Sequence, residues 1–187
     1  MSAVCNDLLQ TEIGCLVLGV DGQGRVCFIG FTDGDSAVGD LTTGGPADMD
    51  FAAGDTRHPV AMGSDAAAEG LNKSRGQCAA LKKQLTEYFN GQRRNFDFAP
   101  VIAGTEFQRQ VLQAVAAVPY GEVISYAELA RRVGRPQAVR AVGNALGANK
   151  TAILVPCHRV VRGSGKNGGY RWGDHRKTFL LALERGR

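Results

Sequence analysis

Capping residues, prolines and glycines divide residues 105–147 into short helices. Thr105 with Gln108 and Ser125 with Glu128 form capping boxes, in which a hydroxyl and the side chain three residues later satisfy free backbone N–H groups at a helix start. Apolar residues follow each start at helical spacing. Stops or restarts are predicted at Pro119, Gly121, Gly134 and Pro136. The last two helices, joined by a short turn that contains glycine, have the outline of a helix-turn-helix, and a plain helical hairpin gives the same pattern.

The N-terminal half has the pattern of a small sheet followed by a helix. Two apolar, partly β-branched runs, residues 15–20 and 25–31, flank the turn sequence Asp21-Gly22-Gln23-Gly24, which predicts a β-hairpin. Residues 32–70, rich in Gly, Asp, Ala and Thr, are predicted to form a long loop. A helix that ends at Asn90-Gly91 is predicted from the spacing of Leu81, Leu85, Tyr88 and Phe89. This half offers no catalytic constellation, so it is predicted to be a scaffold.

The charge of the chain is distributed unevenly between its halves. Residues 1–91 contain 6 Lys and Arg against 12 Asp and Glu, a net charge of −6, and residues 92–187 contain 16 against 6, a net charge of +10. The two values sum to the +4 of the whole chain, so a nearly neutral protein has a strongly basic C-terminal half. Such an excess favours a polyanionic partner, first of all nucleic acid, although a solvated basic surface has the same composition.

Length and composition exclude several classes of protein. The 187 residues suffice for one domain or two small ones with a buried core. No apolar run reaches membrane-spanning length, and the N-terminus lacks the basic-then-apolar layout of a signal peptide. The five cysteines, an odd number without close pairs, predict a reducing compartment rather than a disulfide framework. Cysteines and the three histidines lack zinc-site spacing, so no metal is expected.

The predicted helix after Pro136 has an unusual surface, on which Arg140 projects among small residues. Its buried face is predicted to contain Val139, Val142 and Leu146, and its small residues are Ala138, Ala141, Gly143, Ala145 and Gly147. Helices that read the major groove usually carry several Asn, Gln, Arg or Lys side chains. A helix of Ala and Gly can instead approach a backbone or a narrower groove closely. Close helix packing inside the protein is the alternative explanation.

The stretch Pro156-Cys157-His158-Arg159-Val160-Val161 places a thiol next to an imidazole. It follows the apolar run of residues 152–155, which is predicted to be a buried strand. A cysteine at the end of a buried strand, with a histidine beside it, can be a nucleophile whose thiolate is stabilised by its surroundings. An isolated Cys-His pair also fits a buried structural cysteine.

In combination these motifs resemble the O6-alkylguanine-DNA alkyltransferase family. The resemblance rests on Pro156-Cys157-His158-Arg159-Val160, on Arg140-Ala141-Val142-Gly143 and Asn149 before it, and on Gly169-Tyr170-Arg171-Trp172-Gly173 after it. The resemblance extends from about Gly104 to Glu184, and this region is similar to the C-terminal half of the bacterial adaptive-response protein. The N-terminal half matches the family only in outline.

The resemblance implies a two-domain fold. Residues 1–92 would form an α/β domain, a ribonuclease-H-like small sheet plus helix that serves as a scaffold. Residues 93–187 would form a mostly α domain with a helix-turn-helix, which binds DNA and carries out alkyl transfer.

The resemblance also implies a mechanism. Cys157 would accept the alkyl group of O6-alkylguanine in one irreversible displacement, so that each molecule acts once, and O4-alkylthymine is a further candidate lesion. The cysteine must lose its proton to become a thiolate. In the family a buried His–Glu pair, linked to the cysteine by a water, acts as the base, and His158 and Glu184 match that pair. Tyr126 matches the hydroxyl donor near the base, and Asn149 matches the hinge between the recognition helix and the active site.

The implied partner is duplex DNA that contains alkylated guanine, bound through the minor groove with the base flipped out. Arg140 matches the finger that fills the vacated space. The implied DNA-binding residues are Arg135, Arg140, Ala141, Gly143 and Tyr126, and the implied base-pocket residues are Tyr170, Arg171 and Val160. A monomer without cofactor, metal or membrane contact is expected, located in the cytoplasm, or in the nucleus of a eukaryote.

Three other functions fit parts of the sequence. A Cys-His hydrolase or transferase of acyl substrates leaves the basic half unexplained. A lesion sensor of the alkyltransferase-like kind lacks the reactive cysteine, whereas Cys157 is present. A pure helix-turn-helix regulator has no use for Cys157, His158 and Glu184.

Overall fold

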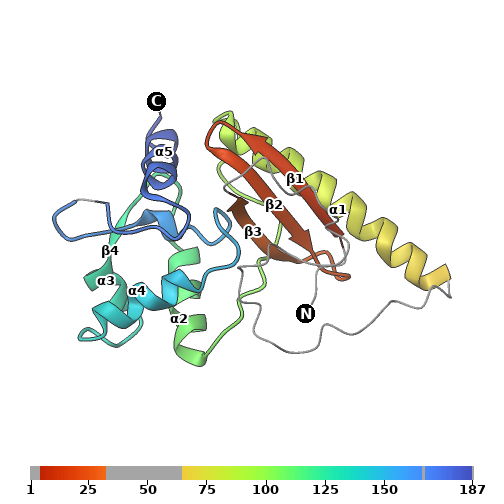
Figure 1. Cartoon of the computed structure of the whole chain (residues 1–187). Coiled ribbons are helices and arrows are strands. Elements are labelled where there is room, and N and C mark those ends of the chain that lie inside the picture. The colour runs from red at the N-terminus through yellow and green to blue at the C-terminus, as the bar shows by residue number, and fades with distance from the viewer. Residues whose placement is uncertain (1–4, 33–64, 166, 187) are drawn as a thin grey trace.

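A small sheet, one long helix and a cluster of short helices lie side by side in the computed structural model (Figure 1). It describes residues 5–32, 65–165 and 167–186. This arrangement of a small sheet with helices confirms the coarse fold class predicted from the sequence.

The N-terminal half is a three-stranded antiparallel sheet along which one helix packs. Its elements are β1 (Cys5–Thr11), β2 (Gly14–Val20), β3 (Val26–Thr32) and α1 (Asp65–Phe89). β2 and β3 confirm the predicted hairpin, and β1 is an addition, since its sequence does not alternate between apolar and polar residues. The predicted helix face is confirmed, because Leu81, Leu85 and Tyr88 are fully buried against the sheet residues.

The C-terminal half consists of short helices around a parallel pair of very short strands. Its elements are α2 (Glu106–Ala116), β4 (Ile124–Ser125), α3 (Tyr126–Arg132), α4 (Val139–Gly147), the 3-10 helix η1 (Cys157–Arg159), β5 (Val160–Val161) and α5 (Asp174–Glu184). β4 pairs with β5, which brings the chain after η1 beside the start of α3. A second apolar core lies among α2, α3 and α4.

Both predicted capping boxes lie at helix starts. At α2 the box is complete, because Thr105 Oγ1 accepts from the Gln108 N–H at 3.3 Å and Gln108 Oε1 accepts from the Thr105 N–H at 2.8 Å. At α3 Ser125 Oγ accepts from the Glu128 N–H at 3.1 Å. The Glu128 carboxylate pairs with Arg131 at 2.6 Å instead of closing the second box.

The predicted strand at residues 152–155 is wrong, because this apolar run forms a buried turn. Ile153 has φ 72°, in the left-handed region that a β-branched residue rarely adopts. The turn satisfies its own backbone groups, since the Val155 N–H donates to the Thr151 carbonyl at 2.9 Å. An apolar run of this length cannot be distinguished from a strand by periodicity.

Two further expectations need correction. Helix α1 begins at Asp65, so residues 65–70 are helical, and residues 33–64 of the predicted loop lie outside the described residues. Val139 is 38% exposed because it begins α4, whereas Val142 and Leu146 are buried as predicted.

The two halves share one apolar core. Residues of the C-terminal half that belong to the same cluster as the sheet and α1 are Ala152, Ile153, Trp172, Leu180 and Leu183. Backbone hydrogen bonds also join the halves, because the Ile29 N–H donates to the Lys150 carbonyl at 2.8 Å and the Ile29 carbonyl accepts from the Ala152 N–H at 2.9 Å. The sheet therefore supports the turn that leads to Cys157.

Gly30 of β3 makes room for the Trp172 ring. A methyl group at Gly30 would lie 2.5 Å from Trp172 Cη2 and 2.7 Å from Phe28 Cζ, closer than carbon atoms can approach. Phe28 and Trp172 meet edge to face, with centroids 6.3 Å apart. The missing side chain of Gly30 is thus required for the contact between the halves.

Gly30→Ala is expected to lower the free energy of unfolding by about 1–3 kcal/mol, the usual cost of overfilling a packed core. Urea unfolding monitored by tryptophan fluorescence measures this, since the single Trp172 reports on the contact. Gly76→Ala is the matched control, because its site in α1 is open and alanine favours a helix. Equal unfolding midpoints for Gly30→Ala and the unmodified chain would contradict the expectation.

Candidate active site

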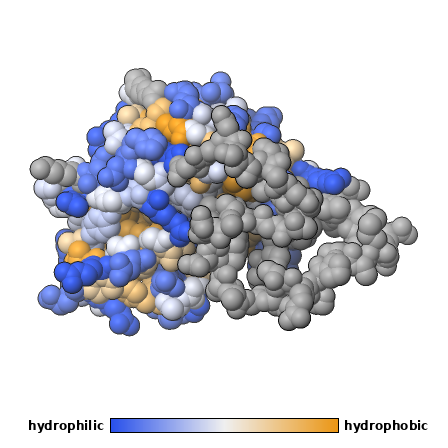
Figure 2. All heavy atoms as spheres, viewed as in Figure 1, coloured by the Kyte–Doolittle hydropathy of each residue, from blue (hydrophilic) through white to orange (hydrophobic). Residues whose placement is uncertain are grey.

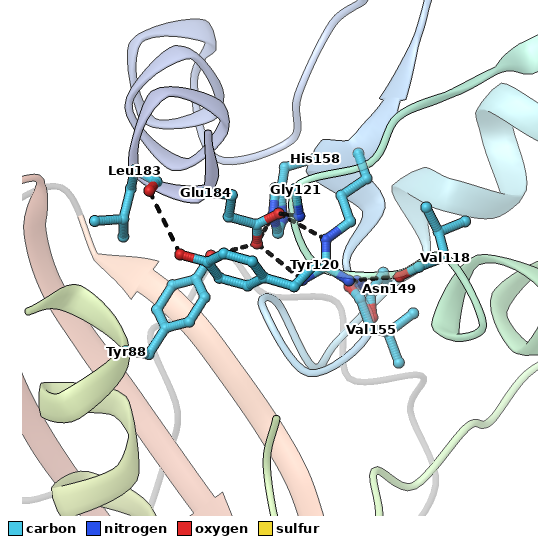
Figure 3. A network of polar contacts seen from close by, with 10 residues as sticks. Tyr88, Val118, Tyr120, Gly121, Asn149, Val155, His158, Leu183 and Glu184 are labelled. Atoms are coloured by element: carbon cyan, nitrogen blue, oxygen red, sulfur yellow. Dashed lines mark hydrogen bonds and ion pairs between the residues drawn. The ribbon is translucent and has the colours of Figure 1, made fainter. Parts of the chain in front are cut away.

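Glu184, the last residue of α5, lies at the centre of a buried hydrogen-bond network (Figure 3). Its Oε1 accepts from His158 Nε2 at 2.9 Å, from the Tyr88 hydroxyl at 2.7 Å and from Arg159 Nη2 at 2.8 Å. Its Oε2 accepts from Arg159 Nε at 2.8 Å and from the Gly121 N–H at 3.1 Å. The predicted pair of His158 and Glu184 is thus in direct contact, and three other residues hold the carboxylate.

Hydrogen bonds decide the charge of this network. Burial alone would raise the pKa of Glu184, but the hydrogen bonds from His158 and Arg159 outweigh burial and hold that pKa well below its usual range. Burial lowers the pKa of His158 by more than the Glu184 carboxylate raises it. The imidazole is therefore neutral at neutral pH. Its proton is on Nε2, which donates to the carboxylate, so Nδ1 can accept one.

His158 Nδ1 is buried and has no hydrogen-bond partner among the residues that the structure describes. Buried polar atoms are almost always paired, so an unpaired acceptor beside a cysteine is a functional signal. His158 and Cys157 are successive residues of η1.

Asn149 braces the turn that carries Cys157. Its Nδ2 donates to the Val155 carbonyl at 2.8 Å and contacts Cys157 Sγ at 3.1 Å. Its Oδ1 accepts from the Thr151 N–H at 3.0 Å. A single amide therefore joins both ends of the turn to the sulfur, at the position that matches the family's hinge between the recognition helix and the active site.

The Cys157 side chain is in its thiol form at rest. Burial raises the pKa of the Cys157 thiol, and the Asn149 amide and the Lys177 ammonium oppose that effect. The thiolate that attacks a carbon must therefore form by loss of a proton to a neighbouring base.

Lys177 is a fully buried cation near the thiol. Its Nζ donates to the Val160 carbonyl at 2.6 Å and lies 5.9 Å from the centre of the Tyr126 ring. It forms no ion pair within the described part of the chain, and burial lowers its pKa. An unpaired buried ammonium favours negative charge close by, so Lys177 stabilises a thiolate at Cys157.

Cys157 faces a cavity of about 620 Å³ between α3, α4 and the glycine-rich segment before α5. That volume is typical of small-molecule sites. The predicted site residues that line it are Tyr126, Arg140, Gly143, Asn149, Cys157, Tyr170 and Arg171. His158 and Glu184 lie behind the cysteine, away from the cavity wall.

Helix α4 presents an arginine and small residues beside the cavity. Arg140 and Ala141 are exposed, and Arg140 has no hydrogen bond or ion pair to the residues described. Gly143 is half-buried, and a methyl group there would lie 3.9 Å from the Tyr126 ring. Arg135 lies before α4 with its guanidinium 5.5 Å from the Phe107 ring. Because Ala141 is exposed, internal packing does not account for the whole small surface of α4.

The face of the molecule that carries α3 and α4 mixes apolar and hydrophilic residues (Figure 2). Two large apolar side chains are exposed on the described surface of this region: Val123, just before β4, and Val139, the first residue of α4.

The opposite wall of the cavity comes from the segment before α5. Arg171 Nη1 donates to the Gly147 carbonyl at the end of α4 at 2.9 Å, and its guanidinium lies 5.2 Å from the Trp172 ring. Tyr170 has a buried hydroxyl without a partner among the residues described. Val160 differs from the prediction, because its side chain belongs to the second core and not to the cavity lining.

Comparison with known proteins identifies the family. Residues 106–186 match the family model described as 6-O-methylguanine DNA methyltransferase, DNA binding domain. The methylated-DNA–protein-cysteine methyltransferase of Mycobacterium bovis is 50% identical over 112 residues, 60% of this chain and 68% of that protein. The chain belongs to the methylated-DNA–protein-cysteine methyltransferase family. Ada of Escherichia coli, a bifunctional transcriptional activator and DNA repair enzyme, is 58% identical over 83 residues, 44% of this chain and 23% of Ada.

These curated family members are matched over part of their length, since the chain spans about two thirds or less of each. A crystal structure of Mycobacterium tuberculosis OGT in complex with DNA has a TM-score of 0.70 at 32% identity and covers 95% of this chain and 91% of that chain. The likeness to that family member therefore includes the N-terminal sheet and helix, which the sequence matched only in outline.

Sequence reasoning missed three residues of this buried network and its surroundings, Tyr88, Arg159 and Lys177. Tyr88 carries no signal, since it was predicted only as part of an apolar helix face. Arg159 is part of the motif and adjoins His158, but this adjacency does not indicate that both side chains bind the same carboxylate. Lys177 lies seven positions before Glu184, two helical turns away on the same side of α5, which is the available signal for it.

No three His, Cys, Asp or Glu side chains gather as a metal site in residues 5–32, 65–165 and 167–186. No helix in the described ranges combines the length and the apolar character needed to cross a membrane.

Proposed function

We propose that this chain is a direct-reversal DNA repair protein that moves the alkyl group of O6-alkylguanine in duplex DNA irreversibly to its own Cys157. One observation carries the proposal: the Cys157 thiol faces a cavity of about 620 Å³, while His158 and Glu184 lie buried behind it. The names of the relatives, methylated-DNA–protein-cysteine methyltransferases from mycobacteria and Bacillus subtilis, support the same activity.

The reaction is a single displacement at the alkyl carbon. Cys157 gives its proton to His158 Nδ1, directly or through one bridging water, and the sulfur electron pair forms the new S–C bond. The C–O6 bond breaks, and its electron pair remains on the guanine oxygen. Tyr126 donates a hydrogen bond to that oxygen, and burial raises the pKa of Tyr126, so its hydroxyl keeps its proton.

Two charged residues stabilise the charges that form during this transfer. Glu184 stabilises the His158 imidazolium once it forms, as the acid does in other nucleophile–base–acid triads. Lys177 stabilises the developing thiolate. A thioether is not cleaved by any group in this site, so the protein is consumed in one turnover.

The DNA reaches Cys157 only after the damaged base has left the stack. We assign Arg140 as the finger that fills the vacated space, because it is exposed beside the cavity without a partner among the described residues. Ala141, Gly143 and Arg135 would contact the minor groove. Tyr170 and Arg171 would form the wall against the flipped base.

Several finer features belong to the same proposal. Helices α3 and α4 would act as a helix-turn-helix, since a turn with Gly134 at φ 70° joins them. Residues 1–92 would form a ribonuclease-H-like domain and residues 93–187 the DNA-binding domain. The protein would act as a cytoplasmic monomer without a cofactor, and O4-alkylthymine would be a second substrate.

Mixing the protein with a duplex that contains one O6-methylguanine tests the proposal. Intact mass analysis is expected to show a gain of one methyl group that saturates at one per molecule, and Cys157→Ala is expected to show none. Tight lesion binding without any mass gain would instead indicate a lesion sensor with a structural cysteine, and repeated turnover of a thioester would indicate an acyl hydrolase.

A further inference from the structure

Tyr88 connects the N-terminal half to the active-site carboxylate. It lies in α1, 96 residues before Glu184, and its hydroxyl donates to Glu184 Oε1 at 2.7 Å. The side chain is fully buried, and its ring packs edge to face on Phe89 and Tyr120. Figure 3 shows the Tyr88 hydroxyl beside Glu184, across from His158.

The Tyr88 hydroxyl is a permanent donor. Burial and the Glu184 carboxylate raise the pKa of Tyr88 well above its usual value, so the phenol keeps its proton at neutral and acidic pH. Oε1 therefore shares its negative charge among Tyr88, Arg159 and His158.

Because several donors share the negative charge of Oε1, this oxygen stabilises a protonated His158 less strongly. A carboxylate oxygen with two strong donors besides the histidine attracts the imidazole proton less strongly than one with a single other donor. The carboxylate cannot rotate away if Tyr88 is lost, because Arg159 binds both of its oxygens and the Gly121 N–H binds Oε2. Removal of the phenol hydroxyl therefore leaves more negative charge on Oε1, facing His158.

The other groups around the pair do not replace this effect. The titratable or charged groups that act on Glu184 or His158 from the surrounding elements are Tyr88, Tyr120, Arg159, Tyr170 and Lys177. Tyr120 donates to the Leu183 carbonyl at 3.4 Å and not to the carboxylate. Of these groups, Tyr88 is the donor to Oε1 that comes from the N-terminal half.

We propose that Tyr88 is a positioning residue for alkyl transfer, through which the N-terminal half sets the proton affinity of His158. The role rests on the proposed function, in which His158 takes the Cys157 proton. Only a neutral imidazole can accept that proton, so the transfer rate falls as pH decreases through the pKa of His158. Tyr88 extends the active range toward lower pH by keeping His158 neutral.

Tyr88→Phe tests the role, in single-turnover methyl transfer from an O6-methylguanine duplex measured against pH. The midpoint of the acid limb is expected to move up by about one pH unit, the order that one hydrogen bond to a charged group can supply. The rate below the midpoint then falls about tenfold, while the alkaline plateau stays within about threefold. Tyr120→Phe, which removes a hydroxyl from the same aromatic cluster, is the control and is expected to keep the midpoint.

A ring-fluorinated tyrosine at position 88 is expected to shift the pH midpoint in the opposite direction. Because it keeps the hydroxyl group, a folding defect cannot account for that shift. Its more acidic hydroxyl is a stronger donor of the same shape, so the midpoint should move down. An unchanged midpoint for both replacements, or an upward shift for both, would overturn the proposal. A lower plateau with a lower melting temperature and an unmoved midpoint would show that Tyr88 is only structural. Absence of transfer by the unmodified chain would instead refute the proposed function.

Discussion

Arg159→Met is expected to destabilise the protein by about 3–5 kcal/mol, the usual cost of breaking a buried ion pair from one side. Arg159 is buried and donates through Nε and Nη2 to both oxygens of Glu184. Its Nη1 donates to the Val118 carbonyl at 2.5 Å, and its guanidinium lies 5.8 Å from the Tyr120 ring. Methionine retains most of the volume but leaves the carboxylate without its strongest partner.

Urea unfolding at neutral pH measures this loss, with Arg162→Met as the control. Arg162 is exposed three residues further along, and its replacement should change stability by less than about 0.5 kcal/mol. Equal effects of the two substitutions would contradict the account of the network.

The difference in the free energy of unfolding between Arg159→Met and the unmodified chain is expected to become smaller at acidic pH. The folded pKa of Glu184 lies below the ordinary value of 4.5, so its contribution to stability is present above that pH and is lost as pH falls below it. Without Arg159 the folded pKa of Glu184 rises toward the unfolded value, and the variant loses less stability in acid. The two unfolding free energies should therefore converge below about pH 4.5.

Arg140→Ala is expected to slow transfer from duplex DNA about a hundredfold, while transfer from the free base, O6-methylguanine, is unchanged. Flipping a base costs a few kcal/mol, and each 1.4 kcal/mol is a factor of ten in rate. Because the finger acts on the vacated stack, only the duplex substrate needs it. Cys157, His158 and Glu184 do not contact Arg140 by any hydrogen bond or ion pair in the described residues.

The Arg140 experiment needs a control for charge. Lys83→Ala removes one positive charge from an exposed position of α1 in the N-terminal half, and it should leave both rates unchanged. Equal losses on the duplex and the free base for Arg140→Ala would refute the finger role and indicate damage to the cavity.

Contiguous motifs made much of the site predictable from the sequence. Cys157 and His158 are adjacent, and the capping boxes at Thr105 and Ser125 give the starts of α2 and α3 correctly. Glu184 has no local signal, and it was found only through the resemblance to the family. Its contact with His158 spans 26 residues of sequence.

Other features arise from tertiary contacts and had no signal in the sequence. An apolar residue of a helix face such as Tyr88 gives no sign that its hydroxyl reaches a carboxylate 96 residues away. The turn at Ile153 replaces the predicted strand because Asn149 satisfies backbone groups on both sides of it. The prediction that the N-terminal half is a passive scaffold is also incomplete, because this half supplies Tyr88 to the network and Gly30 to the packing of Trp172.

Peptide mapping after the reaction shows whether Cys157 is the residue that accepts the alkyl group. Trypsin cleaves after Lys150 and Arg159, so Cys157 is the single cysteine of the peptide 151–159. After reaction with a duplex that carries a deuterated O6-methyl group, this peptide is expected to gain one deuterated methyl, and the peptides with the other four cysteines should gain none. A label on another cysteine, or an unlabelled peptide 151–159 after the lesion has been repaired, would contradict the assignment of Cys157 as the acceptor.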